Sequence, residues 1–487
     1  MLFEPLFAHA GRTPDNIAII DDLGRHSFRQ VAAMAAGLGI YLSAQTDKPR
    51  VGLLLPAGVG YVASFYGTLL AGKSVVPINF LLGEREIAHI IADSGIDTIV
   101  TIPLLAGRLK NSPLKIVDLT QLPQAPSGFA PHFPSPSSDD MAVLMYTSGT
   151  SGLPKGVILS YGNLQSDVDA AIQHAQLIGE HRFLGILPLF HSTGLLATLL
   201  APMQLGALTV YIGRFSPVAT IKAIREHGIS VMAAVPSMYG ALARLKDSTP
   251  ADVQTLYAPL SGGEPLPANV REGFFSKYHK HILEGYGLTE TIGPVTINVP
   301  QAHCPGSVGM PMPGVIIKTV DDDGNALPQG QSGEVWLKGP MIMKGYFNLP
   351  NETAAALTAD GYFKTGDLGM VDSKGFLHIT GRKKDLIIVA GEKAVPREIE
   401  EALMTNPAVA EAAVLGKKDA SRGEVVVAFV ITREGQSVKP DELRETCRAQ
   451  GLAPFKIPRE INFVHDFPRS PTGKVLKRVL AEQLKAE

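Results

Sequence analysis

The sequence predicts an α/β protein: a large N-terminal domain of doubly wound parallel sheets plus a small β-barrel-like unit, then a small α/β C-terminal domain. At 487 residues the chain exceeds the usual size of one folding unit. Short β-branched runs alternate with helical patterns up to about residue 300, and this alternation is typical of βα units. The pattern then changes near residues 306 and 381, so we expect domains 1–381 and 382–487.

In the N-terminal part, five apolar runs have the length and β-branched content of buried parallel strands. They are VGLLL (51–55), SVVPI (74–78), TIVTI (98–102), LTVYI (208–212) and ISVMAAV (229–235). Between them, GYVASFYGTLLAG (60–72) and FSPVATIKAIREHG (215–228) have the apolar spacing of amphipathic helices.

From about residue 306 to 380 the sequence predicts short strands separated by turns, with DDDGNALPQG and VDSKG as turn signals. This is the small, mostly antiparallel β unit. After GRKKD (381–385), α/β character returns. PREIEEALM (396–404) begins a helix with proline, EVVVAFVIT (424–432) is a strand, and DELRETCRAQG (441–451) is a helix that ends at glycine.

Composition excludes several classes of partner. With 44 basic and 46 acidic residues the net charge is −2, which gives no bulk attraction to nucleic acid or anionic membrane. Two distant cysteines, Cys304 and Cys447, support neither a disulfide framework nor a zinc site. The N-terminus lacks the pattern of a signal peptide, and residues 193–210 favour a buried helix and strand over an integral membrane segment. We therefore expect a cytoplasmic protein.

The most informative segment is YTSGTSGLPKG (146–156), which follows the apolar strand MAVLM. Its glycines expose backbone N–H groups, its hydroxyls donate hydrogen bonds, and its lysine adds positive charge, so the segment has the chemistry of a phosphate cradle. Its spacing is not that of the Walker A loop, and no helix is expected after the lysine. By composition alone a flexible solvent loop is the commoner outcome; the strand and the lysine favour phosphate. The phosphate-binding candidates are Thr147, Ser148, Gly149, Thr150, Ser151 and Lys155.

With this loop the sequence resembles the adenylate-forming superfamily of acyl-CoA synthetases, peptide-synthetase adenylation domains and luciferases, and among these it looks most like fatty-acid CoA ligases. The further motifs occur in the family's order along essentially the whole chain. They are PLFHSTG (188–194), SGGEPLP (261–267), EGYGLTET (284–291), GEVWLKGP (333–340), YFKTGDLG (362–369), GRKKDLI (381–387) and PRSPTGKVLKR (468–478). The resemblance implies a mobile C-terminal domain.

The resemblance implies a nucleotide site in which backbone and an aromatic ring enclose the adenine. Its residues would be Gly262, Gly263, Glu264, Pro265, Gly285, Tyr286 and Gly287, with Tyr286 stacked on the base. Asp367 would accept hydrogen bonds from the ribose, and Arg382 would support the sugar or the phosphate. Taken singly, an Asp after glycine is usually a turn residue and a GR pair usually a surface charge.

The resemblance also implies catalytic roles. Lys474 would bridge the substrate carboxylate and the α-phosphate, and Glu290 would hold Mg²⁺ with Thr150 or Thr289 near the phosphates or the metal. His191 would stand at the mouth of the acyl pocket, Lys384 would be the hinge, and Arg214 would contact coenzyme A. Without the resemblance, Glu290 is a helix N-terminal acid, His191 a core residue and Lys474 a solvated charge.

One segment departs from the family pattern. In VAGEKAVP (389–396), Ala390 replaces a glycine of the family's usual form and Lys393 takes the polar position. The sequence therefore does not determine which residues of this loop contact the thiol substrate.

The expected reaction joins an apolar carboxylic acid, with a medium- or long-chain fatty acid favoured, to coenzyme A by way of an acyl-adenylate, using ATP and Mg²⁺. The segments 191–197, 232–239 and 285–294, which we expect to line the acyl pocket, are rich in small and apolar residues. Several alternatives stay open. The substrate alternatives are an aryl acid and o-succinylbenzoate. The others are an enzyme that stops at the adenylate or loads an acyl carrier protein, a stand-alone peptide-synthetase adenylation domain, and a silent nucleotide-binding protein. Homodimer formation is also open.

Overall fold

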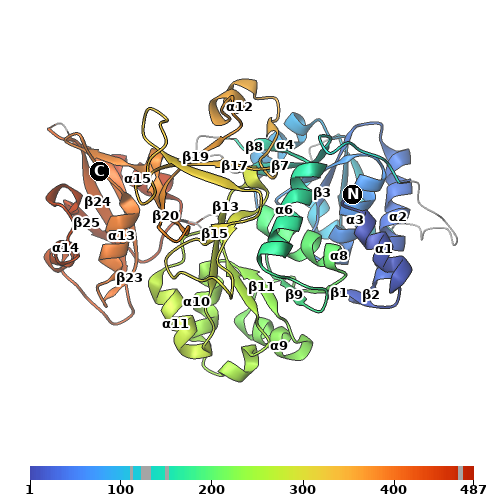
Figure 1. Cartoon of the computed structure of the whole chain (residues 1–487), viewed down its shortest axis with the longest axis horizontal. Coiled ribbons are helices and arrows are strands. Elements are labelled where there is room, and N and C mark those ends of the chain that lie inside the picture. Colours follow the sequence, from blue (N-terminus) through green and yellow to red (C-terminus); the bar gives the residue numbers. More distant parts are fainter. Residues whose placement is uncertain (110–112, 122–132, 148–152, 420, 470–474, 487) are drawn as a thin grey trace. The chain divides into compact units, whose positions relative to one another are not determined.

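The computed structural model describes residues 1–109, 113–121, 133–147, 153–419, 421–469 and 475–486 (Figure 1). These residues form two compact units. The first comprises Met1–Ile316 and Leu337–Phe363, and the second comprises Ile317–Trp336 and Lys364–Glu487. The small β unit therefore groups with the C-terminal residues. The expected domain boundary between residues 381 and 382 stays a prediction.

A nine-stranded sheet forms one layer of the first unit, and its strands from β13 to β1 are parallel. In spatial order it consists of β15 (Met310–Pro311), β14 (Pro294–Ile297), β13 (Leu283–Gly287), β12 (Ala258–Ser261), β11 (Val231–Ala234), β9 (Arg182–Gly185), β10 (Leu208–Tyr211), β1 (Ile17–Asp21) and β2 (Gly24–Ser27).

A seven-stranded sheet forms the second β layer of this unit. Its order is β18 (Gly345–Tyr346), β8 (Lys155–Ser160), β7 (Met141–Thr147), β4 (Ser74–Pro77), β3 (Arg50–Leu54), β5 (Thr98–Thr101) and β6 (Lys115–Asp118). The five strands and two helices expected from the N-terminal sequence all form, with ends displaced by one or two residues. Strand β8 begins at Lys155, so no helix follows the lysine, as expected.

Helices separate and cover the two sheets (Figure 1). Helix α3 contacts β3 and β4 of one sheet and β1 of the other, and α6 contacts β8 of one sheet and β14 of the other. The helices of the unit are α1 (Glu4–Arg12), α2 (Phe28–Gln45), α3 (Val59–Leu70), α4 (Glu84–Ser94), α5 (Pro103–Ala106), α6 (Tyr161–His174), α7 (Ser192–Leu195), α8 (Ala201–Leu205), α9 (Pro217–His227), α10 (Pro236–Arg244), α11 (Ala268–Tyr278) and α12 (Pro350–Ala356). Short turns complete it: η1 (Gly107–Leu109), η2 (Leu119–Gln121), the π-turn η3 (Leu196–Leu200), η4 (Pro250–Val253) and η5 (Thr289–Thr291).

Helix α6 is tied at its start to a distant segment. Ser160 and Asn163 form a capping box, in which each side chain binds the other residue's backbone N–H. The Asn163 amide also donates to the carbonyl oxygens of Pro340 and Ile342, at 2.7 and 2.8 Å. This buried side chain therefore both begins the helix and fixes its position against residues 340–342.

The second unit holds two small sheets. Most of a four-stranded sheet lies in it, in the order β16 (Ile316–Val320), β17 (Gly333–Lys338), β19 (Phe363–Val371) and β20 (Leu377–Arg382). The other sheet has the order β22 (Glu392–Ala394), β21 (Ile387–Val389), β24 (Gly423–Thr432) and β23 (Val409–Asp419), with β25 (Glu460–Phe463) also paired to β24. Its helices are α13 (Pro396–Met404), α14 (Pro440–Ala449) and α15 (Lys477–Ala486), and its short turns are η6 (Lys383–Asp385) and η7 (Pro454–Lys456).

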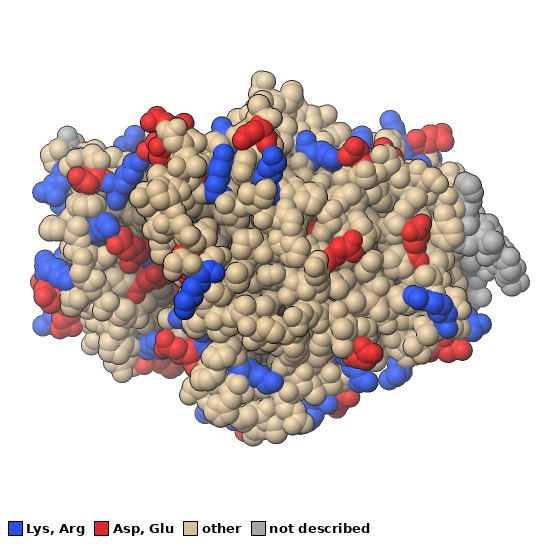
Figure 2. Space-filling model, in the orientation of Figure 1, with Lys and Arg blue, Asp and Glu red and all other residues tan. Residues whose placement is uncertain are grey.

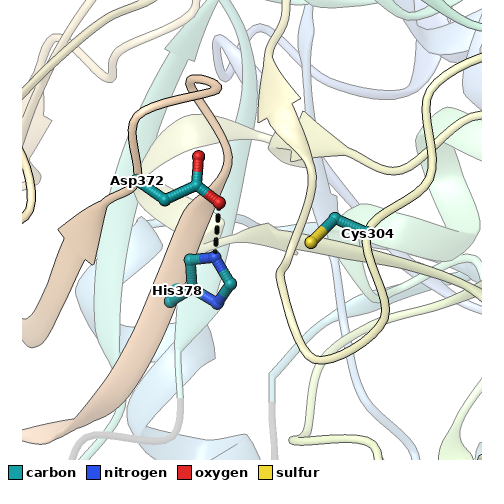
Figure 3. A group of neighbouring side chains, drawn as sticks. All are labelled: Cys304, Asp372 and His378. Atoms are coloured by element: carbon teal, nitrogen blue, oxygen red, sulfur yellow. Dashed lines mark hydrogen bonds and ion pairs between the residues drawn. The ribbon is translucent and has the colours of Figure 1, made fainter.

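The turn between β19 and β20 forms where VDSKG predicts it. Asp372 accepts hydrogen bonds from the backbone N–H groups of Lys374 and Phe376, at 2.9 and 3.0 Å. Figure 3 shows its other carboxylate oxygen facing His378, whose Nε2 lies 3.0 Å away. One aspartate thus closes the turn and links it to the returning strand.

Charges on the surface follow the balanced composition. On the face shown in Figure 2, acidic and basic side chains are interspersed, and neither sign forms a continuous patch. Among the described residues, no helix combines the length and the apolar character needed to span a bilayer.

The hairpin of β21 and β22 contains a strained residue. Its two-residue turn consists of Ala390 and Gly391, and both have positive φ, 51° and 89°. Such a turn matches the twist of the strands, but an L-residue with a side chain costs about 1–2 kcal/mol in this conformation. The alanine that departs from the family pattern therefore carries a local penalty.

We expect Ala390→Gly to raise the free energy of unfolding by about 0.5–1 kcal/mol, because relief of the strain exceeds the added entropy of the unfolded chain. Urea denaturation monitored by circular dichroism would measure it. Gly391→Ala is the matched control and should destabilise the protein. An Ala390→Gly variant no more stable than wild type would contradict this account of the turn.

Candidate active site

The parallel strands of the nine-stranded sheet place their carboxyl ends along one edge. Ligands of open α/β sheets bind at this edge, because the loops that follow the strands converge there. A candidate residue follows nearly every strand: His191 after β9, Arg214 after β10, Gly262 after β12 and Glu290 after β13. The sheet thus gathers residues that lie about 100 positions apart in the chain.

Two candidate adenine-wall segments are adjacent. A Cβ on Gly262 would lie 3.4 Å from the carbonyl oxygen of Gly285, and Gly263 has a φ of 82° that favours glycine. The loop is held by Glu284, a buried residue whose Oε1 accepts a hydrogen bond from the Leu266 N–H at 3.1 Å. Glu284 was not among the predicted site residues. Its position as the first residue of EGYGLTET is the signal that could have revealed it.

A tight turn connects this wall to Glu290. A Cβ on Gly287 would come within 1.9 Å of the Gly293 carbonyl oxygen, so only glycine fits. The Thr291 hydroxyl donates to that same oxygen at 2.8 Å. Buried Ile292 has φ 70° and ψ −51°, a conformation that costs a β-branched residue about 1–3 kcal/mol. The surrounding contacts therefore hold a strained backbone next to Glu290.

Glu290 itself is held from two sides. Its backbone oxygen accepts a hydrogen bond from the Met343 N–H at 2.8 Å, and its Oε1 accepts one from the Tyr346 hydroxyl at 2.8 Å. Burial, and then the charge of Glu290, hold the pKa of Tyr346 well above its usual range, so the phenol keeps its proton and donates. An oriented carboxylate with a second oxygen to offer suits a hard cation such as Mg²⁺.

The described ends of the candidate phosphate loop are Thr147 and Lys155, and Lys155 lies over the ring of Tyr346. Thr147 and Lys155 are opposite each other in the β7–β8 pairing. The Lys155 ammonium is 5.6 Å from the Tyr346 ring centre and forms an ion pair with Glu352 at 2.6 Å. The other loop candidates, Ser148, Gly149, Thr150 and Ser151, lie outside the described residues. Lys155, Tyr346 and Glu290 therefore lie next to one another, with Tyr346 in the middle.

His191 occupies the start of helix α7, directly before a widened stretch of helix. Its ring centre is 4.7 Å from that of Phe190, which in turn lies 5.1 Å from Phe80. Helix α7 continues into a π-turn, η3, a rare feature that often accompanies functional sites. Arg214 is exposed after β10. Its role toward coenzyme A stays a prediction.

Three further candidates belong to the second unit. Asp367 and Arg382 are paired across β19 and β20, and Asp367 Oδ1 lies 2.9 Å from Arg382 Nε. Asp367 is 3% exposed, and its backbone N–H donates to Thr365 Oγ1 at 3.0 Å. The arginine neutralises a buried carboxylate and leaves it oriented, which is what a ribose-binding acid needs.

The hinge candidate Lys384 lies in a single 3₁₀ turn after Arg382. Burial, and then the charge of Arg382, lower the pKa of Lys384. Its neighbour Lys383 behaves oppositely, because a hydrogen bond to Glu334 raises the pKa of Lys383. The two consecutive lysines therefore have different surroundings. Lys474 lies outside the described residues.

One buried acid near the acyl-pocket segments was also missed. Asp167 on α6 is fully buried, and a Cβ on Gly293 would lie 3.0 Å from its Oδ2. Burial raises the pKa of Asp167 well above its usual range. The sequence could have revealed this buried acid, because Asp167 lies four residues after Asn163 on the helix face that also carries the buried residues Leu164 and Val168.

Comparison with known proteins identifies the family. Residues 6–347 match the family model described as AMP-binding enzyme, and residues 398–474 match that of the AMP-binding enzyme C-terminal domain. The chain belongs to the AMP-binding enzyme family. Both parts of this family therefore occur in the order that the motifs predict.

Relatives of known activity act on different acids. A long-chain-fatty-acid–CoA ligase of Bacillus subtilis is 34% identical, over 97% of this chain and 93% of that protein. A feruloyl-CoA synthase of Amycolatopsis is 34% identical, over 92% of this chain and 91% of that protein. A sulfoacetate–CoA ligase of Cupriavidus necator is 36% identical, over 91% and 87%.

Solved structures match over nearly the full length. ATP-bound MatB from Rhodopseudomonas palustris has a TM-score of 0.93 at 30% identity, covering 99% of this chain and 98% of that one. The o-succinylbenzoate coenzyme A synthetase MenE of Bacillus subtilis, in complex with ATP and magnesium, has a TM-score of 0.88 at 29% identity, covering 98% and 99%. The predicted fold class, and the predicted ATP-dependent, AMP-forming acyl-CoA synthetase using ATP, Mg²⁺ and coenzyme A, are confirmed.

Removal of the Tyr346 hydroxyl should weaken Mg²⁺ binding by this AMP-binding enzyme without unfolding it. Tyr346→Phe removes the donor that orients Glu290, and loss of such an outer partner typically costs about 10–100-fold in metal affinity or activity. We expect pyrophosphate release to need more Mg²⁺ for half-maximal rate. Tyr41→Phe serves as a control on a tyrosine of α2. Unchanged Mg²⁺ dependence in Tyr346→Phe would contradict the orienting role.

The buried acid gives a pH test. In the folded protein Asp167 keeps its proton, whereas the unfolded chain releases that proton above about pH 4. The free energy of unfolding of wild type therefore falls as the pH rises towards the raised pKa, by up to about 1.4 kcal/mol per pH unit. Asp167→Asn lacks this titration. The free energy of unfolding of Asp167→Asn, measured by urea denaturation, should therefore rise relative to that of wild type as the pH increases from about 5 to about 7. Asp169→Asn, on an exposed site of the same helix, should show no such gain; a pH-independent difference for Asp167→Asn would refute the assignment.

Proposed function

We propose that this enzyme activates an apolar carboxylic acid, with a medium- or long-chain fatty acid favoured, and transfers the acyl group to coenzyme A. Two groups of neighbouring residues support the proposal. Gly262 and Gly285 offer a wall for adenine, and Glu290, Tyr346 and Lys155 offer a carboxylate for a cation and a lysine for phosphate. A cytoplasmic location is part of the proposal.

In the first half-reaction, the substrate carboxylate attacks the α-phosphorus of ATP, an acyl–phosphate bond forms, and pyrophosphate leaves. Negative groups are brought together, so the site must supply donors and positive charge. Lys474 would bridge the carboxylate and the α-phosphate, while Thr147, Ser148, Gly149, Thr150, Ser151 and Lys155 would hold the phosphates. Glu290, with Thr150 or Thr289, would hold Mg²⁺, which when bound supplies further positive charge. Tyr286 would stack on the adenine and Asp367 would bind the ribose.

In the second half-reaction, the thiol of coenzyme A loses its proton and attacks the acyl carbonyl, and AMP leaves. A thiol with an ordinary pKa near 8.5 needs little help to ionise. We infer that residues 382–487 rotate as a domain about Lys384 between the two steps, since a short 3₁₀ turn concentrates the backbone change in few residues. Arg214 would contact coenzyme A, and His191 would guard the acyl pocket.

The apolar character of the acid follows from the three proposed pocket segments. Among residues 191–197, 232–239 and 285–294, Glu290 is the one fixed charge, and it is assigned to the metal. Neighbouring Asp167 also argues against substrates with a second anionic group, because a carboxyl at the pocket wall offers no positive charge to pair with it. A second carboxylate or a sulfonate is therefore disfavoured, and an apolar aryl acid is the second candidate.

The acyl acceptor and the assembly state are further parts of the proposal. An acyl carrier protein would present a thiol of the same chemistry, so dependence on free coenzyme A distinguishes the two acceptors. Homodimer formation stays open and is measured by light scattering.

The direct test is pyrophosphate release from ATP and Mg²⁺ across fatty, aryl and dicarboxylic acids, with and without coenzyme A. We expect acid-dependent release and acyl-CoA formation with apolar acids. Preference for a dicarboxylic acid would overturn the substrate class. Release without acyl-CoA would overturn the choice of acceptor, and no release with any acid would favour the silent nucleotide-binding protein.

Lys474→Met separates the two half-reactions. Loss of one donor to developing charge typically costs about 10²–10³ in rate, so ATP-dependent adenylate formation should fall by that factor. Conversion of a supplied acyl-adenylate to acyl-CoA should be nearly unaffected, because Lys474 is assigned to the first step alone. Arg478→Met, at an exposed residue close in sequence, is the control. Equal losses in both half-reactions would contradict the assignment.

A further inference from the structure

Asp167 is a buried carboxyl whose two oxygens have no hydrogen-bond partner among the residues that the structure describes. Its side chain is fully buried on the inner face of α6. A buried polar group without a partner is costly, and native proteins rarely leave both oxygens of one carboxyl in this state. The described residues therefore leave this carboxyl unsatisfied.

One of the three proposed acyl-pocket segments lies against this carboxyl at Gly293, and a second reaches the same glycine through Leu196. A Cβ on Gly293 would lie 3.0 Å from Asp167 Oδ2 and 2.6 Å from Leu196 Cδ2. Gly293 ends the strained turn that carries Glu290, and Leu196 begins the π-turn that follows His191. The absence of a side chain at Gly293 thus leaves the carboxyl next to the segments proposed to contact the substrate.

Polar side chains on α6 and on the segments that meet at Gly293 are engaged with backbone groups. The Asn163 amide, one turn earlier on α6, donates to the Pro340 and Ile342 carbonyls. The Thr198 hydroxyl donates to Gly194, and the Thr291 hydroxyl donates to Gly293. His174, at the end of α6, bonds to the Ile297 carbonyl. Neighbouring side chains are therefore used to fix the backbone, which leaves the carboxyl to a ligand.

We propose that Asp167 is a specificity-determining residue that pairs with a hydroxyl group on the acyl part of the substrate. The inference rests on the proposed function and narrows its substrate class to hydroxylated apolar carboxylic acids. A protonated carboxyl donates a hydrogen bond through its O–H and accepts one through its carbonyl oxygen. A hydroxyl group can accept the first of these bonds and donate the second. A site that buries such a group disfavours a substrate that would leave it unpaired.

The protonation state supports a neutral partner. Burial keeps the pKa of Asp167 well above its usual range. A neutral carboxyl suits a hydroxyl better than an ammonium group, which would require the ionised form. An ordered water could make the same hydrogen bonds, and the experiment separates it from a substrate hydroxyl.

The experiment compares kcat/KM for saturated fatty acids with that for the same acids bearing one hydroxyl at successive positions, with ATP, Mg²⁺ and coenzyme A. Wild type is measured beside Asp167→Leu, which keeps the shape without the polar atoms, and Asp167→Asn, which keeps hydrogen-bonding capacity. Asp169→Leu, on an exposed site of α6, is the matched control. Thermal unfolding of each variant shows whether it is folded.

We expect wild type to prefer one hydroxylated acid by about 10- to 100-fold over its unhydroxylated parent. Asp167→Leu should abolish this preference and should retain or raise kcat/KM for the parent acid. Asp167→Asn should keep part of the preference, and Asp169→Leu should leave the preference unchanged. A ratio near one at every position in wild type, or the same ratio in Asp167→Leu as in wild type, would overturn the proposal and assign the carboxyl to a water.

If Asp167→Leu fails to fold, the folded Asp167→Asn variant decides the question alone. Loss of the ratio in Asp167→Asn would then support the proposal, and an unchanged ratio would contradict it. Absence of acyl-CoA with both series would instead overturn the proposed function, and the inference with it.

Discussion

Parallel pairing of the strands from β9 to β13 is the constraint on which the candidate site depends. Because every one of these strands ends at the same edge, the loops after them meet without any contact having to be specified at long range. Strand pairing is a property of the backbone and is insensitive to the identity of most side chains. The loops can therefore vary in sequence and still arrive at one place.

Within that frame, close backbone approach orients the chemistry. The turn from Gly287 to Gly293 leaves no room for side chains at its ends, and it holds buried Ile292 in a strained conformation. Strain of this kind persists only where surrounding contacts determine the backbone. Here the hydroxyl of Thr291, the N–H of Met343 and the hydroxyl of Tyr346 supply those contacts, so Glu290 is presented in one orientation. An oriented carboxylate loses little entropy when it binds a cation.

The buried acid on α6 relates the fold to the diversity of substrates among the relatives. Fatty, feruloyl and sulfoacetate ligases share this architecture at 34% to 36% identity, so the scaffold does not dictate the acid. Discrimination must then come from individual side chains at the pocket wall. A carboxyl with no partner of its own is well suited to this, because it penalises every substrate that leaves it unpaired. Its cost to stability would be tolerated for the sake of selectivity.

The sequence by itself determined the α/β class, five strands and two helices of the first unit, and the family to which the motifs belong. Apolar runs and glycine-rich loops record these features locally, so they need no knowledge of distant contacts. Only the tertiary structure decided that Tyr346 orients Glu290, that Glu284 holds the Leu266 loop, and that Asp167 is buried beside Gly293. Each of these depends on residues between 18 and 126 positions apart along the chain, and a pattern read over one helical turn or one strand carries no record of such a neighbour. The tertiary structure also decided that residues 317–336 group with the C-terminal part, because a compact unit is defined by contacts between segments and not by their order in the chain.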